Sequence, residues 1–270
     1  MNKKEKEIQD KLKEHYIALE RLGYNSDNIV GIFLYGSQNY GTDIATSDVD
    51  TKCLIVPTIE DIISNEVKSN QTIDFGKSGV CTVIDIREYI KEVKKQNINF
   101  LEIMFTDYYI INTRYRTFWN QLLSEKEKLV KYDAMRHFIS VSNQARHTLK
   151  QMSNAVTMPE KNKKVYNAYR LSLFLKAYRD YLFDSWNSEV NAEYKKCLFL
   201  SEDTRETLKK IRCGEAPYPL KEIEEILNEE EEKKNFYAKF SYGNTAYLDV
   251  VLESFVKDCL KINFDIYKNL

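Results

Sequence analysis

The amino-acid sequence predicts an α+β fold, in which a mixed β-sheet with helices is followed by an all-helical half. Short apolar runs rich in β-branched and aromatic residues occur only before residue 112, and from residue 114 onward the apolar residues recur at helical spacing. With eight Gly and four Pro in 270 residues, we expect short loops and a mostly regular chain. We therefore predict a first domain at residues 1–113 and a helical domain at residues 114–270 that closes a cleft.

The first half opens with an amphipathic helix. Apolar residues at helical spacing over 3–22 end at Gly23, which is a common helix stop. Two buried strands are predicted next, at Ile29–Tyr35 and Val49–Val56. Thr58 is then a suitable N-cap for a short helix.

The remainder of the first half alternates between strands and helices. Thr72–Phe75 and Val80–Asp85 flank a four-residue loop and predict a β-hairpin. Arg87–Lys95 predicts a helix, Phe100–Phe105 a helical turn, and Tyr108–Ile111 an edge strand.

The second half shows only helical patterns. The predicted helices lie near residues 115–124, 127–155, 160–184, 202–212, 220–238 and 244–266. No Pro-, Gly- or Ser-rich linker separates the two halves, so we expect them to pack tightly against each other.

Several classes of protein are disfavoured by composition. The five cysteines form no CxxC pair, and the three histidines have no metal-ligand spacing, so we expect neither a disulfide framework nor a zinc site. No apolar run approaches 18 residues, and the charged N-terminus has no signal-peptide core. We predict a cytoplasmic protein without a membrane partner.

The near-neutral net charge conceals two charged blocks. From Arg136 to Arg179 there are nine Lys or Arg residues and one acidic residue, whereas Glu222–Glu232 contains seven Glu and no basic residue. One interpretation is that both blocks are solvated helix faces. The alternative is that the basic block faces a polyanion.

Two carboxylates stand at alternate positions in "GIFLYGSQNYGTDIATSDVDTKCLIVP". Because side chains alternate along a strand, Asp48, Asp50 and Lys52 are expected to share one face. Carboxylates so close repel each other, and a divalent cation relieves that repulsion. Mg²⁺ prefers one or two carboxylates together with substrate phosphates, so Asp48 and Asp50 are candidate metal ligands and catalytic residues.

The turn before this pair suits a phosphate group. Gly36 allows the backbone to approach a ligand closely, and Ser37 offers a hydroxyl and an amide at the start of a turn or short helix. Most Gly-Ser pairs are simple turns, so the signal lies in the order of strand, Gly-Ser, spacer, Asp-x-Asp and strand.

This order resembles the hG[GS]…Dh[DE]h signature of the DNA polymerase β-like nucleotidyltransferase superfamily, carried here by Gly36, Ser37, Asp48 and Asp50. "IDIREYIKEVKKQNINFLEIMFT" and "YNAYRLSLFLKAY" further resemble bacterial and phage nucleotidyltransferase-domain proteins related to the RlaP branch. The resemblance is strong through residue 111 and looser beyond it. It implies that the aspartates bind Mg²⁺ or Mn²⁺, that the Gly-Ser turn holds a nucleoside triphosphate, and that a third strand carboxylate activates the acceptor.

The third carboxylate is where the chain departs from this pattern. Thr82 stands at the position where the relatives carry an acid. We predict Asp85 as the third catalytic residue, with Asp74 on the preceding strand as a second candidate. An N-cap role for Asp85, at the helix beginning near Arg87, explains that residue equally well.

Lys163, Asn167 and Arg170 share one face of a predicted helix. Lys163 and Arg170 are predicted to bind the nucleotide by neutralising triphosphate charge, and a solvated basic face is the alternative. Asn97 and Glu102 are interpreted as structural residues, an N-cap with its apolar continuation.

The predicted function is Mg²⁺-dependent transfer of a nucleoside monophosphate from a nucleoside triphosphate to an acceptor hydroxyl, with release of pyrophosphate. The acceptor is open between an RNA 3′ end, a protein and a small molecule. One alternative is a catalytically weakened nucleotide-binding or partner-binding protein that kept the fold, a hypothesis supported by Thr82. Another is the protein-modifying arm of a toxin–antitoxin pair, whose target is encoded nearby.

Overall fold

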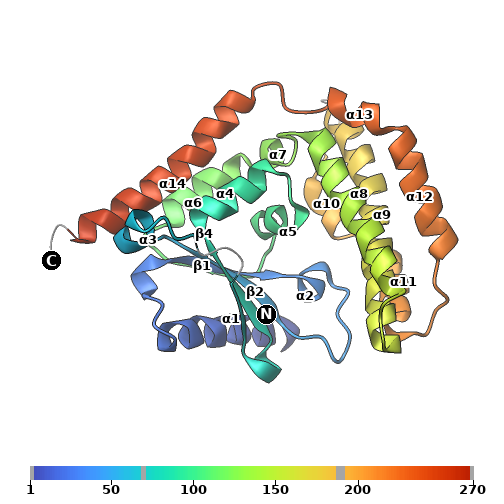
Figure 1. Cartoon of the computed structure of the whole chain (residues 1–270), viewed down its shortest axis with the longest axis horizontal. Coiled ribbons are helices and arrows are strands. Elements are labelled where there is room, and N and C mark those ends of the chain that lie inside the picture. The colour runs from blue at the N-terminus through green and yellow to red at the C-terminus, as the bar shows by residue number, and fades with distance from the viewer. Residues whose placement is uncertain (1–2, 68–70, 187–191, 268–270) are drawn as a thin grey trace.

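The structure, a computed structural model, describes residues 3–67, 71–186 and 192–267, and its N-terminal half contains a five-stranded mixed sheet (Figure 1). The strand order is β3-β4-β2-β1-β5. The strands are β1 (Ile29–Tyr35), β2 (Asp50–Ile55), β3 (Gln71–Asp74), β4 (Val80–Asp85) and β5 (Tyr109–Ile111). β2 and β4 are parallel, and the other pairs are antiparallel. The predicted hairpin and edge strand are both confirmed.

The register of the sheet decides which polar side chains meet. Tyr35, the last residue of β1, pairs with Asp50, the first residue of β2. In the parallel pair, Lys52 lies beside Thr82, and Ile55 lies beside Asp85. Asp50 and Asp85 are therefore at opposite ends of their strands.

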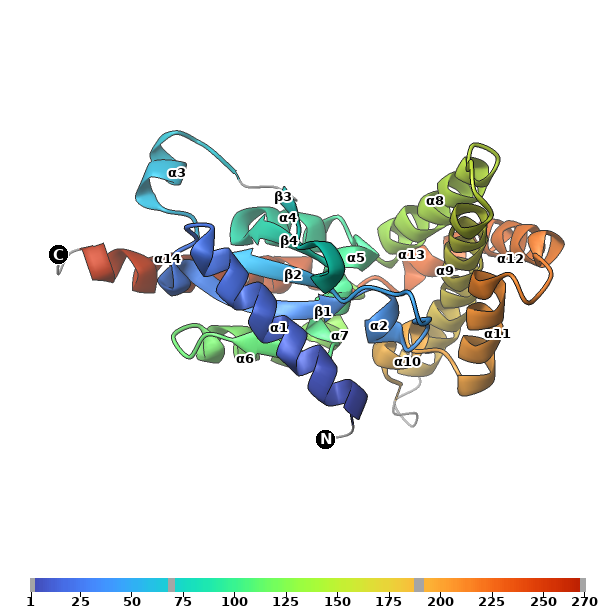
Figure 2. The ribbon, with the colours of Figure 1, turned by 90° about the horizontal axis from the view of Figure 1, so that it is seen from below.

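One face of the sheet is covered by α1 (Lys3–Arg21), which lies across the strands (Figure 2). The buried side of α1, including Leu12 and Leu19, joins a core with alternate strand residues such as Cys53 and Val83. His15 adds a buried polar contact, because its Nδ1 lies 2.8 Å from Thr51 Oγ1.

The other face is covered by α4 (Ile86–Lys94), α6 (Arg116–Ser124) and α14 (Thr245–Tyr267). Trp119 of α6 lies 4.6 Å from the Phe33 ring and 6.1 Å from the Phe255 ring of α14, measured between ring centroids. The C-terminal helix thus returns to the sheet half (Figure 1), and one apolar core extends through both halves. The boundary at residue 113 stays a prediction.

The helical half is built on α8 (Ala134–Met152) and α9 (Met158–Trp186), which pack against each other. α11 (Glu202–Cys213) and α12 (Leu220–Glu232) pack on α9. The shorter elements are α2 (Ser37–Tyr40), α3 (Ile59–Ile63), α5 (Ile98–Leu101), α7 (Lys126–Leu129), α10 (Tyr194–Leu198), α13 (Lys234–Lys239), η1 (Ser26–Asn28), η2 (Gly76–Ser78) and η3 (Glu102–Met104).

The single helix predicted over 127–155 is wrong, because the chain breaks between α7 and α8. Asp133 is the N-cap of α8, and its side chain accepts a hydrogen bond from the Arg136 backbone N–H. α8 therefore begins at Ala134 as a separate helix, and the residues between α7 and α8 are not helical. α10 was not predicted, since its five residues carry too short an apolar pattern.

A buried histidine joins the two halves. His137 Nδ1 lies 2.8 Å from the Gln96 carbonyl oxygen, and its Nε2 lies 3.0 Å from the Tyr194 hydroxyl. Burial lowers the pKa of His137 to about 4, with the Gln96 carbonyl opposing that shift.

Among the helices of the described ranges, none has the length and apolar character needed to cross a lipid bilayer.

Candidate active site

The turn after β1 requires glycine. Gly36 has φ +75° and ψ −154°, a conformation that residues with a Cβ rarely adopt. A Cβ atom at this position would lie 3.3 Å from Asp50 Oδ2. The glycine therefore brings the backbone of the turn against Asp50, one of the two predicted metal ligands.

The carboxylate pair lies at the entrance of β2. Asp50 is half-buried as the first strand residue, and Asp48 is exposed in the preceding loop. Burial raises the pKa of Asp50; the charge of Lys163 opposes this shift, and the negative charge of Asp48 adds to it. The structure thus brings Asp48, Asp50 and Lys163 within electrostatic reach, although the last residue is far away in sequence.

A cavity of about 200 Å³, here called the central cavity, lies between the two halves of the chain. Gly36, Ser37 and Asp50 line it from the sheet half, and Lys163 and Arg170 line it from α9. Four predicted nucleotide-binding residues therefore meet one of the predicted metal ligands in a single cavity.

The helical half also holds the rim of this cavity. The Tyr166 hydroxyl of α9 lies 2.5 Å from Thr42 Oγ1, just after the Gly-Ser turn. Arg212 of α11 lines the cavity and donates a hydrogen bond to the Thr42 carbonyl oxygen at 3.2 Å. These contacts hold the segment after the Gly-Ser turn against α9 and α11, the helices that carry Lys163, Arg170 and Arg212.

Arg170 is a buried cation without hydrogen-bond partners for two of its nitrogens. The side chain is 6% exposed, and its guanidinium carbon lies 4.2 Å from the centroid of the Tyr40 ring. Within the described residues, Nε and Nη1 have no acceptor. Unpaired buried donors are costly, and phosphate oxygens are suitable acceptors for them. The solvated face considered for this residue is therefore not what the structure shows.

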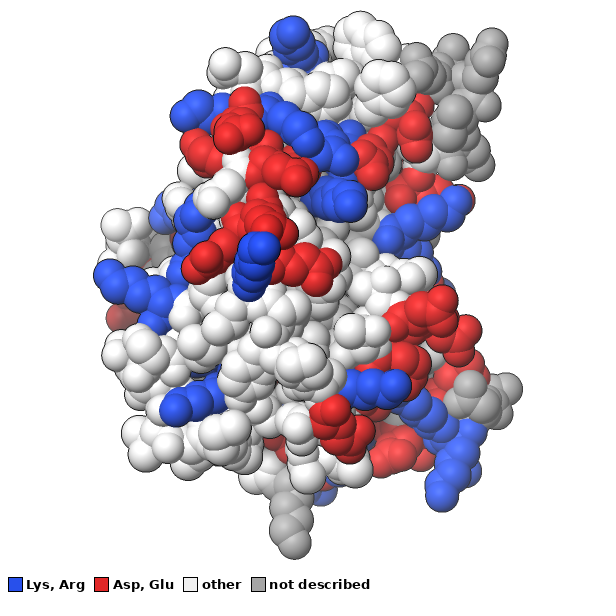
Figure 3. Space-filling view, turned by 90° about the vertical axis from the view of Figure 1, so that its right-hand side faces the viewer, with Lys and Arg blue, Asp and Glu red and all other residues white. Residues whose placement is uncertain are grey.

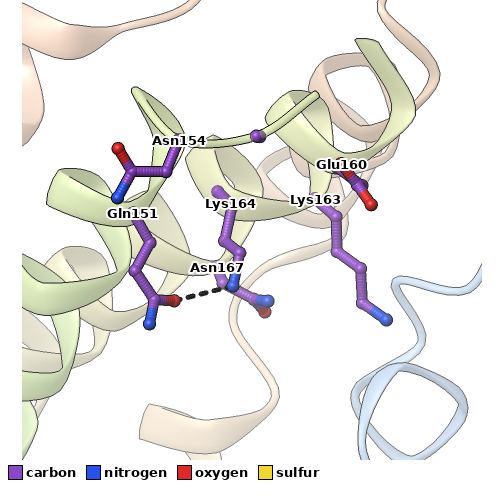
Figure 4. A pocket seen from close by; sticks show the side chains of 7 residues that line it. Gln151, Asn154, Glu160, Lys163, Lys164 and Asn167 are labelled. Atoms are coloured by element: carbon purple, nitrogen blue, oxygen red, sulfur yellow. Dashed lines mark hydrogen bonds between the residues drawn. The ribbon is translucent and has the colours of Figure 1, made fainter. Parts of the chain in front are cut away.

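Lys163 is exposed and extends from α9 toward the light-blue ribbon of the N-terminal half (Figure 4). It also lines a second, side cavity of about 520 Å³, together with Asn167 and Gln151. Gln151 accepts a hydrogen bond from Lys164 at 2.7 Å (Figure 4). Because Lys163 and Asn167 line both cavities, the side cavity adjoins the central one.

The basic block does not form one surface. Of its nine basic residues, Lys163 and Arg170 line the central cavity. Arg179 is paired with Glu230, and Arg146 donates to the Leu227 carbonyl oxygen at 3.1 Å. Figure 3 accordingly shows basic and acidic side chains side by side on the face that it displays.

The structure does not bring Asp85 to the site. Asp85 is the N-cap of α4, where it accepts a hydrogen bond from the Arg87 N–H at 2.7 Å and pairs with the Arg87 guanidinium at 2.6 Å. It lies beside Ile55, at the far end of β2 from Asp50. Asp74 is exposed on edge strand β3 and accepts from the Gly76 N–H. Neither residue lines the central cavity.

Thr82 lies on β4, at the position where the resemblance implies an acid. It is beside Lys52 in the sheet, and its Oγ1 lies 3.4 Å from Thr72 Oγ1. Burial raises the pKa of Tyr35 to about 12, and the Thr82 hydroxyl opposes that shift. The expected carboxylate position is thus filled by a hydroxyl next to Tyr35.

Glu102 is a cavity residue that we interpreted as structural from the sequence. It lines the central cavity, is 1% exposed, and its Oε1 lies 3.4 Å from Lys52 Nζ. Its Oε2 has no hydrogen-bond partner among the described residues. Burial raises the pKa of Glu102 to about 8, opposed by Arg170 and by the Gly36 N–H. The sequence signal was an acid inside the apolar run "NFLEIMF".

The carboxylate oxygens of Asp48 and Asp50 suit a hard divalent ion that also binds the phosphates of a substrate. In the described part of the chain, no group of three or more His, Cys, Asp or Glu residues is placed to hold a metal. Asp48 and Asp50 supply two carboxylates, and Mg²⁺ commonly uses one or two of these with substrate phosphates and water. The residues present therefore fit an ion that arrives with a nucleotide.

The sheet, the Gly-Ser turn, the Asp-x-Asp strand and the facing cationic helix together define a protein of the polymerase β type of nucleotidyltransferase. Consistent with this class, a family model described as RlaP, the RNA repair pathway DNA polymerase beta family, matches residues 5–181. The chain belongs to this family. No curated protein matches it.

Proposed function

We propose that this protein transfers a nucleoside monophosphate from a nucleoside triphosphate to an acceptor hydroxyl and releases pyrophosphate, in the presence of Mg²⁺ or Mn²⁺. One observation carries the proposal: Gly36, Ser37 and Asp50 share a cavity with Lys163 and Arg170. Phosphoryl transfer depends mostly on positioning and on charge stabilisation, and these residues supply both.

Each residue has a role in this proposal. Gly36 leaves room for a phosphate beside the backbone, and Ser37 offers its hydroxyl. Arg170 and Lys163 neutralise triphosphate charge from the helical side. Asp48 and Asp50 would hold the divalent ion, which neutralises charge on the phosphate oxygens when it is bound.

For the acceptor, we propose the 3′ hydroxyl of RNA. The description of the matching family refers to RNA repair. The side cavity adjoins the central cavity, and besides Glu160 and Ala155 it is lined by lysine and amide side chains, which suit phosphates and nucleotide edges. Protein and small-molecule hydroxyls are the alternatives that the experiment below distinguishes.

The test is incubation of the purified chain with each α-³²P-labelled nucleoside triphosphate, Mg²⁺ or Mn²⁺, and a short RNA with a free 3′ hydroxyl. We expect the RNA to gain label, the same RNA with a 3′ phosphate to gain none, and the D48N/D50N double variant to be inactive. Parallel reactions offer a mixture of proteins, including any encoded beside this chain, and an aminoglycoside. Labelling of one of these instead of RNA would contradict the proposed acceptor.

A second candidate is a nucleotide-binding protein that has lost turnover. It is favoured by Thr82 at the acid position and by the placement of Asp85 and Asp74 outside the central cavity. It predicts that nucleoside triphosphates bind with an affinity that depends on Asp50, and that no acceptor gains label under any condition.

A further inference from the structure

We propose that Glu102 is the catalytic residue that accepts the proton of the acceptor hydroxyl, in place of the strand carboxylate absent at Thr82. This inference rests on the proposed function and adds a residue to it. Glu102 reaches the central cavity from η3, an element that follows the sheet strands carrying the motif.

The two oxygens of Glu102 have different surroundings. Oε1 faces Lys52 Nζ at 3.4 Å, and Lys52 also donates to the Asn99 carbonyl oxygen. Oε2 is buried and accepts no hydrogen bond of normal geometry within the described part of the chain, although the Gly36 N–H lies close enough to the carboxyl group to lower its pKa. A buried acceptor without a partner is destabilising, and a hydroxyl bound in the cavity would supply the missing donor.

The charged and titratable groups around Glu102 come from four elements. Lys52 of β2 and Arg170 of α9 are basic side chains, and Tyr35 of β1 and Tyr194 of α10 are phenols. Burial lowers the pKa of Lys52 to about 7, and the charge of Asp50 opposes that shift. Burial raises the pKa of both phenols, so neither accepts a proton near neutral pH. A guanidinium has no acceptor lone pair, and Lys52 Nζ already lies against the Asn99 carbonyl oxygen and Glu102 Oε1. In this set, Glu102 Oε2 is therefore the acceptor atom without a hydrogen-bond partner.

Arg170 and Glu102 suit different groups of the proposed reaction, the phosphates and the acceptor hydroxyl. The unpartnered nitrogens of Arg170 suit phosphate oxygens, whereas the unpartnered oxygen of Glu102 repels phosphate and suits an O–H group. Among the groups of the proposed reaction, the acceptor hydroxyl is the O–H that must lose its proton.

The acceptor oxygen forms a bond to the α-phosphorus, and the bond from that phosphorus to the bridging oxygen of pyrophosphate breaks. The acceptor proton moves to Glu102 Oε2, and pyrophosphate leaves with the electron pair of the broken bond. After the products leave, the proton passes from Glu102 to water.

The experiment compares E102Q with E230Q in the labelled RNA assay. Glu230, like Glu102, is 1% exposed and lies beside a basic side chain, in its case Arg179. Because Glu230 does not line the central cavity, E230Q is the matched control for a buried acid. We expect E102Q to slow transfer roughly 10²–10⁴-fold, the usual range for general-base catalysis, with nucleotide affinity changed less than threefold. E230Q should keep the wild-type turnover.

Two further measurements distinguish proton transfer from a structural role. The wild-type turnover rate should rise with pH through about 8, where burial places the pKa of Glu102, and E102Q should lose that dependence. In the double variant T82D/E102Q, a carboxylate is restored on the strand, and the turnover rate should be at least tenfold higher than that of E102Q. The pH profile of the wild-type protein supplies an answer if E102Q folds poorly, because it needs no substitution at Glu102.

Several results would overturn the inference. E102Q turning over within threefold of wild type excludes proton acceptance by Glu102. A parallel loss of turnover and nucleotide affinity, without rescue by T82D, indicates a structural role. If the wild-type protein binds nucleotide but labels no acceptor, the proposed function fails and the inference falls with it. If wild type is active and E102Q is equally active, only the inference fails.

Discussion

Asp50 Oδ2 lies 3.3 Å from the position that a Cβ atom on Gly36 would occupy. This contact follows from the register of β1 and β2, in which Tyr35, the neighbour of Gly36, is paired with Asp50. The two parts of the Gly-Ser and Asp-x-Asp motif are therefore in contact, and any side chain on the glycine would press on a predicted metal ligand.

Gly36→Ala should weaken binding of a Mg²⁺–nucleoside triphosphate complex at least tenfold. The new methyl group crowds Asp50 Oδ2, and φ +75° with ψ −154°, a backbone conformation essentially restricted to glycine, adds strain of about 1–3 kcal/mol. Gly76→Ala is the control, because Gly76 has φ +62° and nothing within 4 Å of the new Cβ. Calorimetric titration should show weaker binding for the first variant and unchanged binding for the second; equal losses would refute the steric argument.

Asp50→Asn should leave the unliganded protein as stable as wild type or slightly more stable. Burial and the negative charge of Asp48 raise the pKa of Asp50, so its charged form is disfavoured in the empty site. The thermal stabilisation produced by Mn²⁺ with a nucleoside triphosphate should disappear. Asp107→Asn, at an exposed residue paired with Lys195, should retain that stabilisation in the same melting experiment. A ligand shift that survives in Asp50→Asn would remove this residue from the metal site.

Arg170→Met should reduce triphosphate affinity about 10–100-fold, the loss expected for hydrogen bonds to a charged group. Its effect on the free energy of unfolding should stay below about 1 kcal/mol, because two of the nitrogens it removes have no partner. Urea denaturation and nucleotide titration measure the two quantities separately.

Arg179→Met should behave in the opposite way. Arg179 is paired with the buried Glu230, and removing one partner of such a pair costs about 3–5 kcal/mol in a fully buried setting, less here because Arg179 is partly exposed. Nucleotide affinity should not change, since Arg179 does not line the central cavity. If Arg170→Met and Arg179→Met changed nucleotide affinity and the free energy of unfolding to the same extent, the assignment of Arg170 to binding and of Arg179 to stability would be contradicted.

Protonation of His137 should destabilise the folded chain in acid. Its folded-state pKa is about 4 against an ordinary 6.5, so the unfolded chain binds more protons and stability falls as pH drops from about 6.5 toward 4. The full difference is about 3 kcal/mol. His137→Gln should lower stability at pH 7 and flatten this part of the pH profile. An unchanged slope in denaturation curves between pH 7 and pH 4.5 would show that other groups control it.

The helical half shows where local pattern is insufficient. Its apolar periodicity located α9, α11 and α14, but the continuous pattern over 127–155 did not reveal the break before α8. That break depends on Asp133, which caps a new helix, and on Ser241 from a distant segment, whose hydroxyl oxygen accepts a hydrogen bond from the Ala134 backbone N–H at 3.0 Å. A contact across so many residues leaves no mark on local periodicity.

The sequence by itself determined the family, the positions of the strands along the chain and the residues of the motif, since the motif of Gly36, Ser37, Asp48 and Asp50 is defined by local spacing and backbone conformation. Only the tertiary structure decided which distant side chains complete the cavity. Strand register carried Asp85 away from the motif, and chain packing brought Glu102 and Arg170 toward it. The physical reason is that burial and pairing depend on neighbours from other elements, which no short segment specifies.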